Sequence, residues 1–506
     1  MVIGAGIGGL VASLLLAASG REVVVLERAA RVGGKMREVE VDGAAIDSGP
    51  TVFTLRSVFD AIFAGAGARL DDHVRLREAD VLARHAWEGG ARLDLYADPL
   101  RSEAAIGEAF GAAEARGFRA FDKAAAEIWG LLEESFVRAP EPSLPRLMAS
   151  QGLFGAQRLM AIRPFTGLMS ALGSFFRDPR LAQLFGRYAT YTGSNPYEAP
   201  ATLMLIAHVE RCGVFLVEGG MQRLADALAA LAIDRGARIR TGTGVREIRV
   251  EGGRVAGVVT DEGEAIAART IIANADAGAI AAGILGRDAA GAVPSMRAGE
   301  RSLSAVTMSM RVRTRGFPLS RHNVFFSPDY AAEFAAIFGR GQLPADPTVY
   351  VCAQDRDDGS AGADGPERLF TIVNAPARGD VRPFTSEEIS ACETATFRRL
   401  ERLGLVVERR AEQVRTTSPN EFERMFPGTG GALYGRASHG WNASFERPAA
   451  RTRLPGLYLA GGSIHPGAGV PMAALSGWSA AHLISRDTDS STRSRTTAMS
   501  GGTSTS

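Results

Sequence analysis

The chain begins with two short apolar runs separated by a helical pattern. Val2–Ile3 precede a glycine-rich turn, leucines then recur at helical spacing up to Gly20, and a second apolar run, Val23–Leu26, ends at Glu27. Short apolar runs between turn signals predict buried strands, whereas a period of about 3.6 residues predicts a helix. The start of the chain is therefore predicted to be a strand–helix–strand unit that ends on an acidic residue.

The next part of the chain is predicted to be mainly helical. The pattern predicts helices over residues 56–138, interrupted by a β-hairpin within residues 81–96. Residues 143–185 are also helix-like and rich in Leu, Met and Phe, with arginines among them. Their apolar side chains either enter a bilayer while the arginines meet anionic headgroups, or form the core of a helical substrate domain. We favour the core for any single helix, and both interpretations can hold on different faces.

Strands return in the second half of the chain. A strand at the start of residues 215–231 passes through a Gly-Gly turn into a helix. The chain ends with an apolar strand at Leu457, a glycine-rich loop and a helix from Met472 to about residue 485. The Ser/Thr/Gly-rich residues 487–506 are predicted to be disordered. Between these segments, strands are predicted at residues 237–240, 245–250, 255–260, 270–276, 303–313 and 348–352, with a helix at 386–403.

The composition indicates a globular protein with more than one domain. The 506 residues are 46% hydrophobic and 22% charged, which is enough to bury a large core. The net charge of +1 gives no basis for nucleic-acid binding. The three cysteines are widely spaced, so buried free thiols are favoured over a metal site. No apolar run reaches the roughly 18 residues of a membrane-spanning helix. The first strand is unusually short, and we expect strand residues upstream of Met1.

The first turn carries the glycine spacing GxGxxG. Gly4 permits the tight turn from strand to helix, Gly6 lets the backbone approach a pyrophosphate, and Gly9 lets the helix pack close to the strand. The helix N-terminus supplies free N–H groups and a positive dipole end for phosphates. Glu27 stands where an acidic residue holds the ribose hydroxyls. Such a turn is weak evidence alone, but with both strands and the acidic residue in register it predicts dinucleotide binding.

The dinucleotide-binding domain is predicted to be discontinuous. Its pieces are residues 1–75, 210–285 and 452–486, and the intervening residues 76–209 and 286–451 form a substrate domain. An NAD dehydrogenase rarely needs a final strand and a glycine-rich helix start at the C-terminal end, whereas FAD needs backbone groups from a distant segment to hold its ring. The sequence therefore favours FAD and predicts an α/β fold, with a Rossmann-like FAD-binding domain and a discontinuous α+β substrate domain.

Several motifs lie in order along residues 2–485. They are Gly4–Gly9 with Glu27, Gly33–Lys35, Asp47–Thr51, Glu218–Met221, Asn274–Asp276 and His465–Pro471. This set resembles the bacterial-type phytoene desaturases, a carotenoid desaturase family of amine-oxidase-like FAD flavoproteins, and the last motif is the most specific. Three segments resemble the branch of 1-hydroxycarotenoid 3,4-desaturases, also called methoxyneurosporene dehydrogenases. They are Gly49–Thr54, Leu82–Trp87 with Leu93–Tyr96, and Leu184–Tyr191.

The resemblance implies a set of cofactor contacts. The pyrophosphate is implied at Gly4, Gly6 and Gly9, the adenosine ribose at Glu27 and the adenine at the backbone of Val245. The flavin side is implied at Gly33, Gly34 and Lys35, and the ribityl chain and isoalloxazine ring at Gly461, Gly462, Val470, Pro471 and Met472. Further contacts are implied at Ala5, Gly8, Arg28, Gly49, Pro50, Thr51 and Asn274. Relatives often carry an acidic residue after the last strand, where this chain has Gly461-Gly462-Ser463, so contacts there would come from the backbone or from Ser463.

The implied reaction removes two hydrogens from adjacent saturated carbons beside a polyene. These carbons carry no acidic proton, so the flavin takes a hydride while the protein supplies an apolar tunnel, orientation and exclusion of water. His465 is the best-placed candidate for the proton acceptor, and a purely structural loop histidine is an equal alternative. No metal site is predicted. Candidates for the tunnel lining are Tyr188, Tyr191, Trp441 and Phe445, although core aromatic residues are commoner.

Three functions remain open at this point. The resemblance favours insertion of a C-3,4 double bond into an acyclic 1-hydroxy- or 1-methoxycarotenoid of the spheroidene or spirilloxanthin type. The alternatives are desaturation of phytoene and a non-catalytic carrier of prenyl groups or lipids, against which the intact phosphate loop stands. An amino-acid or polyamine oxidase is disfavoured because the apolar mid-chain segments suit a long hydrocarbon. The expected partners are the carotenoid, the cytoplasmic side of a membrane as a peripheral surface, and an electron acceptor such as a quinone or oxygen; no nucleic acid is expected.

Overall fold

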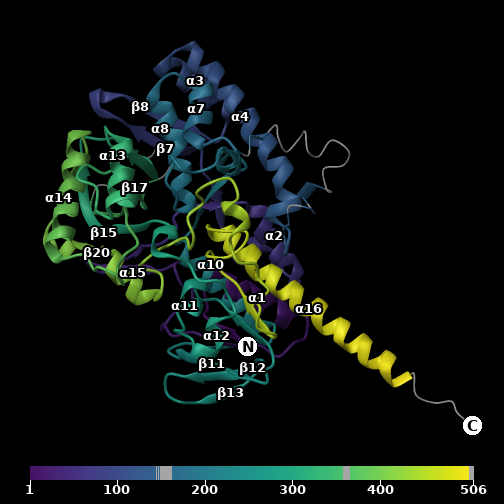
Figure 1. The fold of residues 1–506 in the computed structure, drawn as a ribbon. Helices are drawn as coiled ribbons and strands as arrows, with labels where there is room; N and C mark the ends of the chain where they lie inside the picture. Colours follow the sequence, from purple (N-terminus) through teal and green to yellow (C-terminus); the bar gives the residue numbers. More distant parts are fainter. Residues whose placement is uncertain (144, 146, 149–161, 164, 357–364, 501–506) are drawn as a thin grey trace, which may run out of the picture.

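The computed structural model describes residues 1–143, 145, 147, 148, 162, 163, 165–356 and 365–500. Figure 1 shows three regions. Helices α3, α4, α7 and α8 form the top of the molecule, a second sheet covered by α14 lies on the left, and the region around α1 and α10 lies below the centre, with α16 extending from it.

A five-stranded sheet is the framework of the predicted cofactor domain. Its spatial order is β10-β2-β1-β14-β21, and every neighbouring pair is parallel. Strand β1 is flanked by residues from distant parts of the chain, since Val2 pairs with Val25 on one side and Ile272 on the other. This is the α/β arrangement that the sequence predicted. The strands are β1 (Val2–Ile3), β2 (Val24–Leu26), β10 (Arg238–Arg240), β14 (Ile271–Ala273) and β21 (Leu457–Leu459).

The helices around this sheet pack unusually close together at one crossing. Helix α1 (Ile7–Ala18) contacts both α10 (Gln222–Asp234) and α16 (Val470–Ser500). A Cβ atom on Gly477 of α16 would lie 2.1 Å from the carbonyl oxygen of Gly8 in α1. Real Cβ atoms do not approach backbone so closely, so the crossing of these two helices requires glycine at position 477.

Helix α16 continues well beyond the packed part of the molecule (Figure 1). The structure differs here from the disorder predicted for residues 487–506, because the helix runs to Ser500, and residues 501–506 lie outside the described residues. The Asp487 carboxylate accepts hydrogen bonds from Arg451 at 2.6 Å and from the Tyr458 hydroxyl at 2.5 Å. These bonds fix the helix near residue 487, and extending a nucleated helix costs far less than starting a new one.

The second sheet has the spatial order β19-β15-β18-β17-β16-β7-β8, and β20 also pairs with β15. Its ladders are antiparallel except for β16 with β7. The predicted hairpin at residues 81–96 is present and forms one edge, a position that its own pattern did not reveal. The strands are β7 (Val81–Ala86), β8 (Arg92–Tyr96), β15 (Ser304–Arg315), β16 (His322–Phe325), β17 (Val349–Ala353), β18 (Glu367–Ala375), β19 (Val406–Glu408) and β20 (Val414–Thr417).

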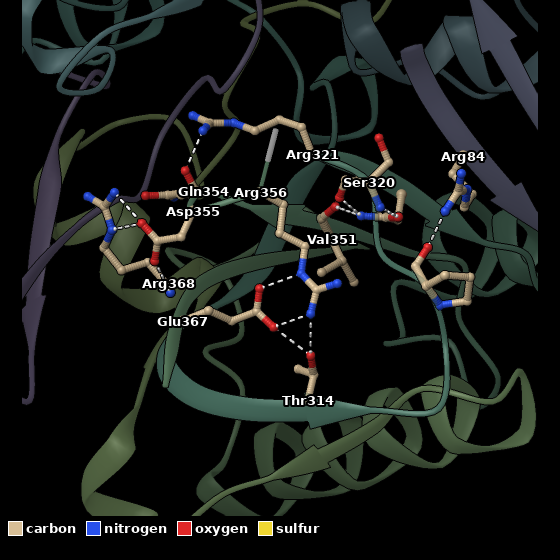
Figure 2. Close-up of polar contacts among 12 residues, drawn as sticks. Arg84, Thr314, Ser320, Arg321, Val351, Gln354, Asp355, Arg356, Glu367 and Arg368 are labelled. Atoms are coloured by element: carbon tan, nitrogen blue, oxygen red, sulfur yellow. Dashed lines mark hydrogen bonds and ion pairs between the residues drawn. The ribbon is translucent and has the colours of Figure 1, made fainter. Parts of the chain in front are cut away.

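Buried polar contacts connect the strands of the second sheet (Figure 2). Arg356 and Glu367 form an ion pair, with Nε 2.7 Å from Oε2, and the Thr314 hydroxyl donates to the same carboxylate at 2.5 Å. The Arg356 and Glu367 side chains are only 10% and 2% exposed. The pair joins the segment after β17 to β18, and Thr314 connects β15 to it. Removing one partner of such a pair leaves an uncompensated buried charge, so it stabilises the sheet only while both residues are present.

The remaining elements cover the two large sheets and connect them. The small sheets contain β3 (Glu38–Val41) and β4 (Ala44–Asp47); β5 (Phe53–Thr54), β6 (Leu76–Glu78) and β9 (Val214–Val217); and β11 (Val245–Glu251), β12 (Arg254–Thr260) and β13 (Ala265–Ala267). The other α-helices are α2 (Arg56–Gly65), α3 (Pro99–Phe110), α4 (Ala112–Leu132), α7 (Leu168–Phe175), α8 (Pro179–Gly186), α9 (Leu205–Arg211), α11 (Ala277–Ala281), α12 (Arg287–Ala290), α13 (Tyr330–Phe334), α14 (Ser386–Arg402) and α15 (Pro419–Met425). Shorter helical turns are η1 (Leu70–Asp72), η2 (Glu88–Gly90), η3 (Glu133–Val137), η5 (Arg187–Thr192), η6 (Ala201–Met204), η7 (Ala298–Glu300), η8 (Ala335–Gly339), η9 (Ala411–Gln413) and η10 (Ala443–Phe445).

The helix-like segment at residues 143–185 is described only in part. Residues 144, 146, 149–161 and 164 lie outside the described residues, so neither interpretation is tested for them. Within the described part, Leu168, Leu172 and Phe176 are buried, as the core interpretation expects, whereas Met148 and Phe165 are exposed. None of the helices in the described residues is long and apolar enough to span a bilayer.

The cysteines follow the sequence prediction in two of three positions. Cys352 and Cys392 are buried free thiols. Cys212 is exposed, which corrects the expectation that all three are buried. It follows directly on Arg211, the last residue of α9, and its thiol lies 3.4 Å from Nε2 of His208.

Candidate active site

One large cavity lies between the carboxyl ends of the parallel strands and the second sheet. It encloses about 930 Å³, within the range of roughly 300–1,000 Å³ that is typical of ligand pockets. Ligands of open parallel sheets bind outside the carboxyl ends of the strands. The cavity therefore lies where a dinucleotide is expected. The sequence-predicted cofactor residues that line it are Gly4, Gly6, Gly8, Glu27, Arg28, Gly33, Gly34, Lys35, Gly49, Pro50, Thr51, Val245, Asn274, Gly461, Gly462, Val470, Pro471 and Met472.

Two residues implied as cofactor contacts lie behind the cavity wall instead. Ala5 is fully buried, and its N–H donates to Oε2 of Glu27 at 2.6 Å. A Cβ atom on Gly9 would lie 2.2 Å from the carbonyl oxygen of Gly4. Gly9 thus allows α1 to pack against β1, as the glycine spacing predicted, but neither residue faces the cavity. Both shape the loop, because the first turn of α1 presents only one side to the ligand space.

The start of α1 leaves polar groups free for an anion. Its N-cap residue, Gly6, makes no side-chain capping hydrogen bond, and the first N–H groups of a helix have no intrahelical partners. Across the loop, Nδ2 of Asn274 donates to the carbonyl of Ala460 at 2.9 Å, while its Oδ1 has no hydrogen-bond partner among the described residues. A Cβ atom on Gly6 would lie 2.7 Å from that oxygen. The loop combines unused donors with space that only glycine leaves, which suits a pyrophosphate.

Glu27 closes β2 at the adenosine end of the cavity. Its carboxylate accepts the N–H of Ala29 at 2.8 Å in addition to that of Ala5. These bonds fix the carboxylate at the cavity wall, which Arg28 and Val245 also line. A carboxylate has further acceptor sites after two hydrogen bonds, so Glu27 retains the capacity to accept from ribose hydroxyls.

The loops at Gly33–Lys35 and Gly49–Thr51 cross closely at the predicted flavin side. A Cβ atom on Gly49 would lie 2.0 Å from the carbonyl oxygen of Lys35. Nζ of Lys35 donates to the carbonyl of Leu433 at 2.7 Å and lies 5.2 Å from the centre of the Phe426 ring. Burial lowers the pKa of the Lys35 ammonium, and the charge of Asp276 partly offsets that effect. The crossing fixes Lys35 in the wall of the cavity.

The C-terminal loop brings a second helix N-terminus to the cavity. Helix α16 begins at Val470, where three consecutive residues line the wall. The N–H of Gly461 donates to Oγ of Ser476 at 2.7 Å. Oγ of Ser463 accepts the N–H of Ala277 at 3.2 Å, so this serine holds the loop against the chain that follows β14. The sequence left open whether the backbone or Ser463 contacts the ligand here. Because Ser463 is already bonded to Ala277, the geometry favours the backbone.

His465 is turned away from the cavity that its neighbours line. Its side chain is 2% exposed, and Nε2 lies 2.9 Å from the carbonyl oxygen of Phe136. Burial lowers the pKa of the imidazole to about 4, although hydrogen bonds to backbone partly offset this. Pro466 lines the cavity but His465 does not. The geometry therefore favours the structural interpretation of His465 over its assignment as proton acceptor.

The rest of the cavity is apolar, and we call it the apolar arm. It extends between α4, η3, η6 and α9. Of the four aromatic residues that the sequence proposed for a tunnel, Tyr191, Trp441 and Phe445 line the cavity, whereas Tyr188 is 3% exposed and lies behind the wall. The apolar arm is lined mainly by Trp129, Leu132, Phe136, Val137, Leu147, Ile162, Phe165, Leu203, Ile206, Val209, Trp441 and Phe445.

Among the polar side chains that line the apolar arm are Arg187, Tyr191 and Glu210, which we call the Arg187 cluster. The Glu210 carboxylate accepts hydrogen bonds from the hydroxyls of Tyr191 at 2.7 Å and Tyr188 at 2.6 Å. Nη2 of Arg187 donates to the Tyr191 hydroxyl at 3.1 Å. Sequence reasoning missed Arg187 and Glu210. Arg187 lies within a motif that was singled out, but nothing in the sequence shows that η5 and α9 bring it close to Glu210.

A hydrogen-bonded chain links the flavin-side loop to the second sheet. The hydroxyls of Thr51 and Tyr350 are 2.6 Å apart, and Nδ1 of His322 lies 2.7 Å from the same Tyr350 oxygen. Burial, together with the charges of nearby Arg321 and Arg187, lowers the pKa of His322 to about 3. His322 is therefore neutral near pH 7, and Tyr350 presents a fixed hydroxyl to the cavity.

Comparison with known proteins identifies the family. The family model for flavin-containing amine oxidoreductases matches residues 7–485. The chain belongs to the flavin-containing amine oxidoreductase family. Within the family, it is 51% identical to a hydroxyneurosporene desaturase of Rubrivivax gelatinosus, covering 100% of this chain and 96% of that one. It is 45% identical to a hydroxyneurosporene desaturase of Cereibacter sphaeroides, over 97% and 98% of the two chains. The resemblance to carotenoid desaturases inferred from the motifs is thereby confirmed.

More distant amine oxidoreductases share the fold. A 4,4'-diapolycopene oxygenase of a Methylomonas species is 29% identical over 94% of this chain and 96% of its own. Among solved structures, a putrescine oxidase superposes with a TM-score of 0.59 at 15% identity, covering 96% of this chain and 98% of the other. An oxidoreductase from Methanosarcina mazei gives a TM-score of 0.57 at 17% identity over 94% and 98%. At such low identity, the two structures support the predicted fold class and no particular substrate.

The family requires a flavin, and the cavity of this amine oxidoreductase fits FAD. The helix start at Gly6, Asn274 and the second helix start at Val470 line one continuous space. The predictions of FAD as cofactor and of an FAD-dependent oxidoreductase are confirmed by the family match. The individual FAD contacts remain predictions. Ala5 and Gly9 are no longer among the predicted contacts, because neither lines the cavity.

Proposed function

We propose that this protein is an FAD-dependent desaturase that introduces a C-3,4 double bond into an acyclic 1-hydroxy- or 1-methoxycarotenoid. The observation that carries the proposal is a single cavity that joins the dinucleotide loop at Gly6 to the apolar arm. Full-length relatives named hydroxyneurosporene desaturases support the substrate class. An arm of this composition suits a long hydrocarbon, and the carboxylate of Glu210 in its wall is already bonded to two tyrosine hydroxyls.

The protein's own residues bind, orient and shield the substrate in this reaction. When bound, the flavin supplies the acceptor for the hydride, and the second hydrogen leaves as a proton. The apolar arm holds the polyene, with Trp129, Phe136 and Phe445 among its walls, and excludes water from the reacting carbons. Thr51 and Tyr350 fix the polar wall next to the predicted flavin side. A quinone or oxygen would accept the two electrons from the reduced cofactor.

We further propose that the substrate enters from a membrane on the cytoplasmic side, with the protein bound peripherally. Three cavity-lining side chains are also exposed: Met148 by 45%, Phe165 by 65% and Trp441 by 53%. The rings of Phe165 and Trp441 are 5.3 Å apart. Exposed aromatic residues at the mouth of a hydrocarbon cavity suit the interface of a bilayer, where carotenoids reside.

The decisive experiment compares substrates on the purified, flavin-loaded enzyme. 1-Hydroxyneurosporene, 1-methoxyneurosporene and phytoene are supplied in lipid vesicles with a quinone, and products are separated by chromatography with spectral detection. We expect the products of the two oxygenated carotenoids to absorb at longer wavelengths than their substrates, since each desaturation extends the conjugation. Conversion of phytoene with no conversion of the oxygenated substrates would establish the phytoene desaturase alternative. A protein that purifies without flavin and cannot be loaded would instead support the carrier of prenyl groups or lipids.

A further inference from the structure

The Arg187 cluster holds a charged group without a charged partner. Arg187 is only 8% exposed. None of its nitrogens lies within 4 Å of a carboxylate oxygen among the described residues. Its Nε has no hydrogen-bond partner in the described part of the chain. Burial lowers the pKa of the guanidinium, but Tyr191, Glu210 and Tyr188 together raise it above its usual value. Arg187 is therefore charged at neutral pH. Of its five N–H donors, only one, on Nη2, has a hydrogen-bond acceptor among the described residues.

The other members of the Arg187 cluster have little donor capacity left. Both oxygens of Glu210 are occupied by tyrosine hydroxyls, and each tyrosine has only one hydroxyl hydrogen to give. The Tyr191 oxygen also accepts from Nη2 of Arg187. The donor that remains is the guanidinium of Arg187, at the wall of a cavity whose neighbouring surface is apolar. A ligand that completes this cluster must supply an oxygen that accepts a hydrogen bond.

We propose that Arg187 binds the oxygen atom on C-1 of the substrate and thereby selects oxygenated over purely hydrocarbon carotenoids. This inference rests on the proposed function and names the residue that reads its end group. A guanidinium donor serves both substrate forms, because a hydroxyl and a methoxy oxygen can each accept a hydrogen bond. A bound carotene without oxygen would cover Arg187 and leave its N–H groups without an acceptor. Burial of an unpaired donor is costly, so the site would bind such a carotene poorly.

The position of the Arg187 cluster also suits the place of reaction. C-1 is three bonds from C-4, so the oxygen-binding group must lie within a few ångströms of the reacting carbons, since each bond measures about 1.5 Å. The charge of Arg187 acts on both Tyr350 and His322. Tyr350 is hydrogen-bonded to Thr51, which lies in the loop at the predicted flavin side. Binding of the oxygen at Arg187 therefore places C-3 and C-4 toward that loop.

The test is the preference of the enzyme among three substrates that differ only at the C-1,2 end, where two carry an oxygen on C-1 and the third carries a C-1,2 double bond. Wild type and Arg187→Met are assayed with 1-hydroxyneurosporene, 1-methoxyneurosporene and neurosporene, and kcat/KM is compared. Methionine keeps an unbranched, partly apolar side chain but donates no hydrogen bond. We expect kcat/KM for the two oxygenated substrates to fall about 10- to 100-fold, the loss typical of one charge-assisted hydrogen bond. Activity on neurosporene should stay level or rise, so the preference collapses.

Tyr188→Phe is the matched control. Tyr188 bonds to the same carboxylate as Tyr191 but does not line the cavity. Its loss should change kcat/KM for all three substrates by one common factor and leave the preference intact. Tyr191→Phe removes the acceptor of Nη2 and should reduce the preference in part. Far-ultraviolet circular dichroism and flavin content establish that each variant is folded. Arg187→Lys replaces Arg187→Met if the latter does not fold, and it should weaken the preference because a lysine ammonium cannot reproduce the guanidinium geometry.

A binding measurement separates recognition from turnover. Quenching of tryptophan fluorescence gives Kd for each carotenoid in detergent micelles, and Arg187→Met should raise Kd only for the oxygenated pair. An equal loss for all three substrates, or an unchanged preference, would overturn the role of Arg187. Failure of wild type to convert any 1-oxygenated substrate would overturn the proposed function itself. The two failures are therefore distinguishable.

Discussion

The crossing of α1 and α16 gives the sharpest prediction about how the fold supports the cofactor site. Gly477→Ala would place a Cβ atom 2.1 Å from the carbonyl oxygen of Gly8, whereas contacts below 3.0 Å are essentially never seen. The two helices must separate by about 0.9 Å at least. The obstacle is backbone, so no flexible side chain can move aside.

The magnitude follows from two opposing effects. Overpacking costs about 1–3 kcal/mol, and replacing glycine by alanine within a helix returns about 1 kcal/mol. The net loss of stability is therefore modest, at most about 2 kcal/mol. The effect on FAD should be larger, since the first turns of both helices line the cavity. Displacement of positioned groups by about 1 Å typically costs around 100-fold, and we expect the Kd for FAD to rise 10- to 100-fold.

Gly130→Ala is the matched control for this substitution. Gly130 lies in α4, is exposed, and has no atom within 4 Å of a Cβ placed there. It should gain about 1 kcal/mol of stability and retain FAD at wild-type affinity. Kd is measured by titrating apoprotein with FAD and following flavin fluorescence, and stability by urea unfolding. A Gly477→Ala variant that binds FAD as tightly as Gly130→Ala would refute the link between this helix crossing and the cofactor site.

Three further predictions follow from particular contacts. Arg356→Met should destabilise the protein by about 3–5 kcal/mol in urea unfolding, because it leaves the buried Glu367 carboxylate without its partner charge. The double variant with Glu367→Leu should recover most of this loss. A double variant no more stable than the single one would contradict the argument. The pKa of His465 is about 4 in the folded state and about 6.5 in the unfolded state. Between these values only the unfolded state binds the proton, so stability should fall as pH drops from 6.5 toward 4. His465→Gln should flatten that part of the stability profile measured by thermal unfolding. Finally, Phe165→Ser with Trp441→Ser should reduce flotation of the protein with anionic lipid vesicles, with Gly130→Ala as an unaffected control; undiminished flotation would place the membrane surface elsewhere.

The local part of the cofactor site was predictable because its signals are contiguous in the sequence. Gly4, Gly6 and Glu27 belong to one strand–helix–strand unit, whose turn geometry is fixed by neighbouring residues. The same reasoning overreached at Ala5 and Gly9. Those residues share the motif, but the N–H of Ala5 is bonded to Glu27 and Gly9 packs against Gly4, so neither lines the cavity. A motif identifies the loop that binds, and only the structure shows which of its atoms face the ligand.

The pattern of hydrophobic and polar positions could not predict contacts between distant segments. Glu210 reads as an ordinary polar residue of an amphipathic helix, and its pairing with Tyr188 and Tyr191 depends on how α9 packs beside η5. The orientation of His465 was equally hidden, because its partner Phe136 is 329 positions away. The extension of α16 was missed because composition alone indicated disorder, while the anchor at Asp487 comes from Arg451 and Tyr458.

The cavity is divided into a dinucleotide end and an apolar arm that come from different parts of the chain. The parallel sheet and the two helix starts at Gly6 and Val470 supply every feature of the dinucleotide end, and none of them touches the apolar arm. The arm is built from α4, α9 and the helical turns between them, which belong to the intervening segments of the chain. Substrate chemistry can therefore change without disturbing the flavin. Within such an arm, a single buried guanidinium is costly unless a ligand completes its hydrogen bonds. The presence of Arg187 in a largely apolar arm is thus best explained by a substrate that carries an oxygen atom close to the bond that reacts.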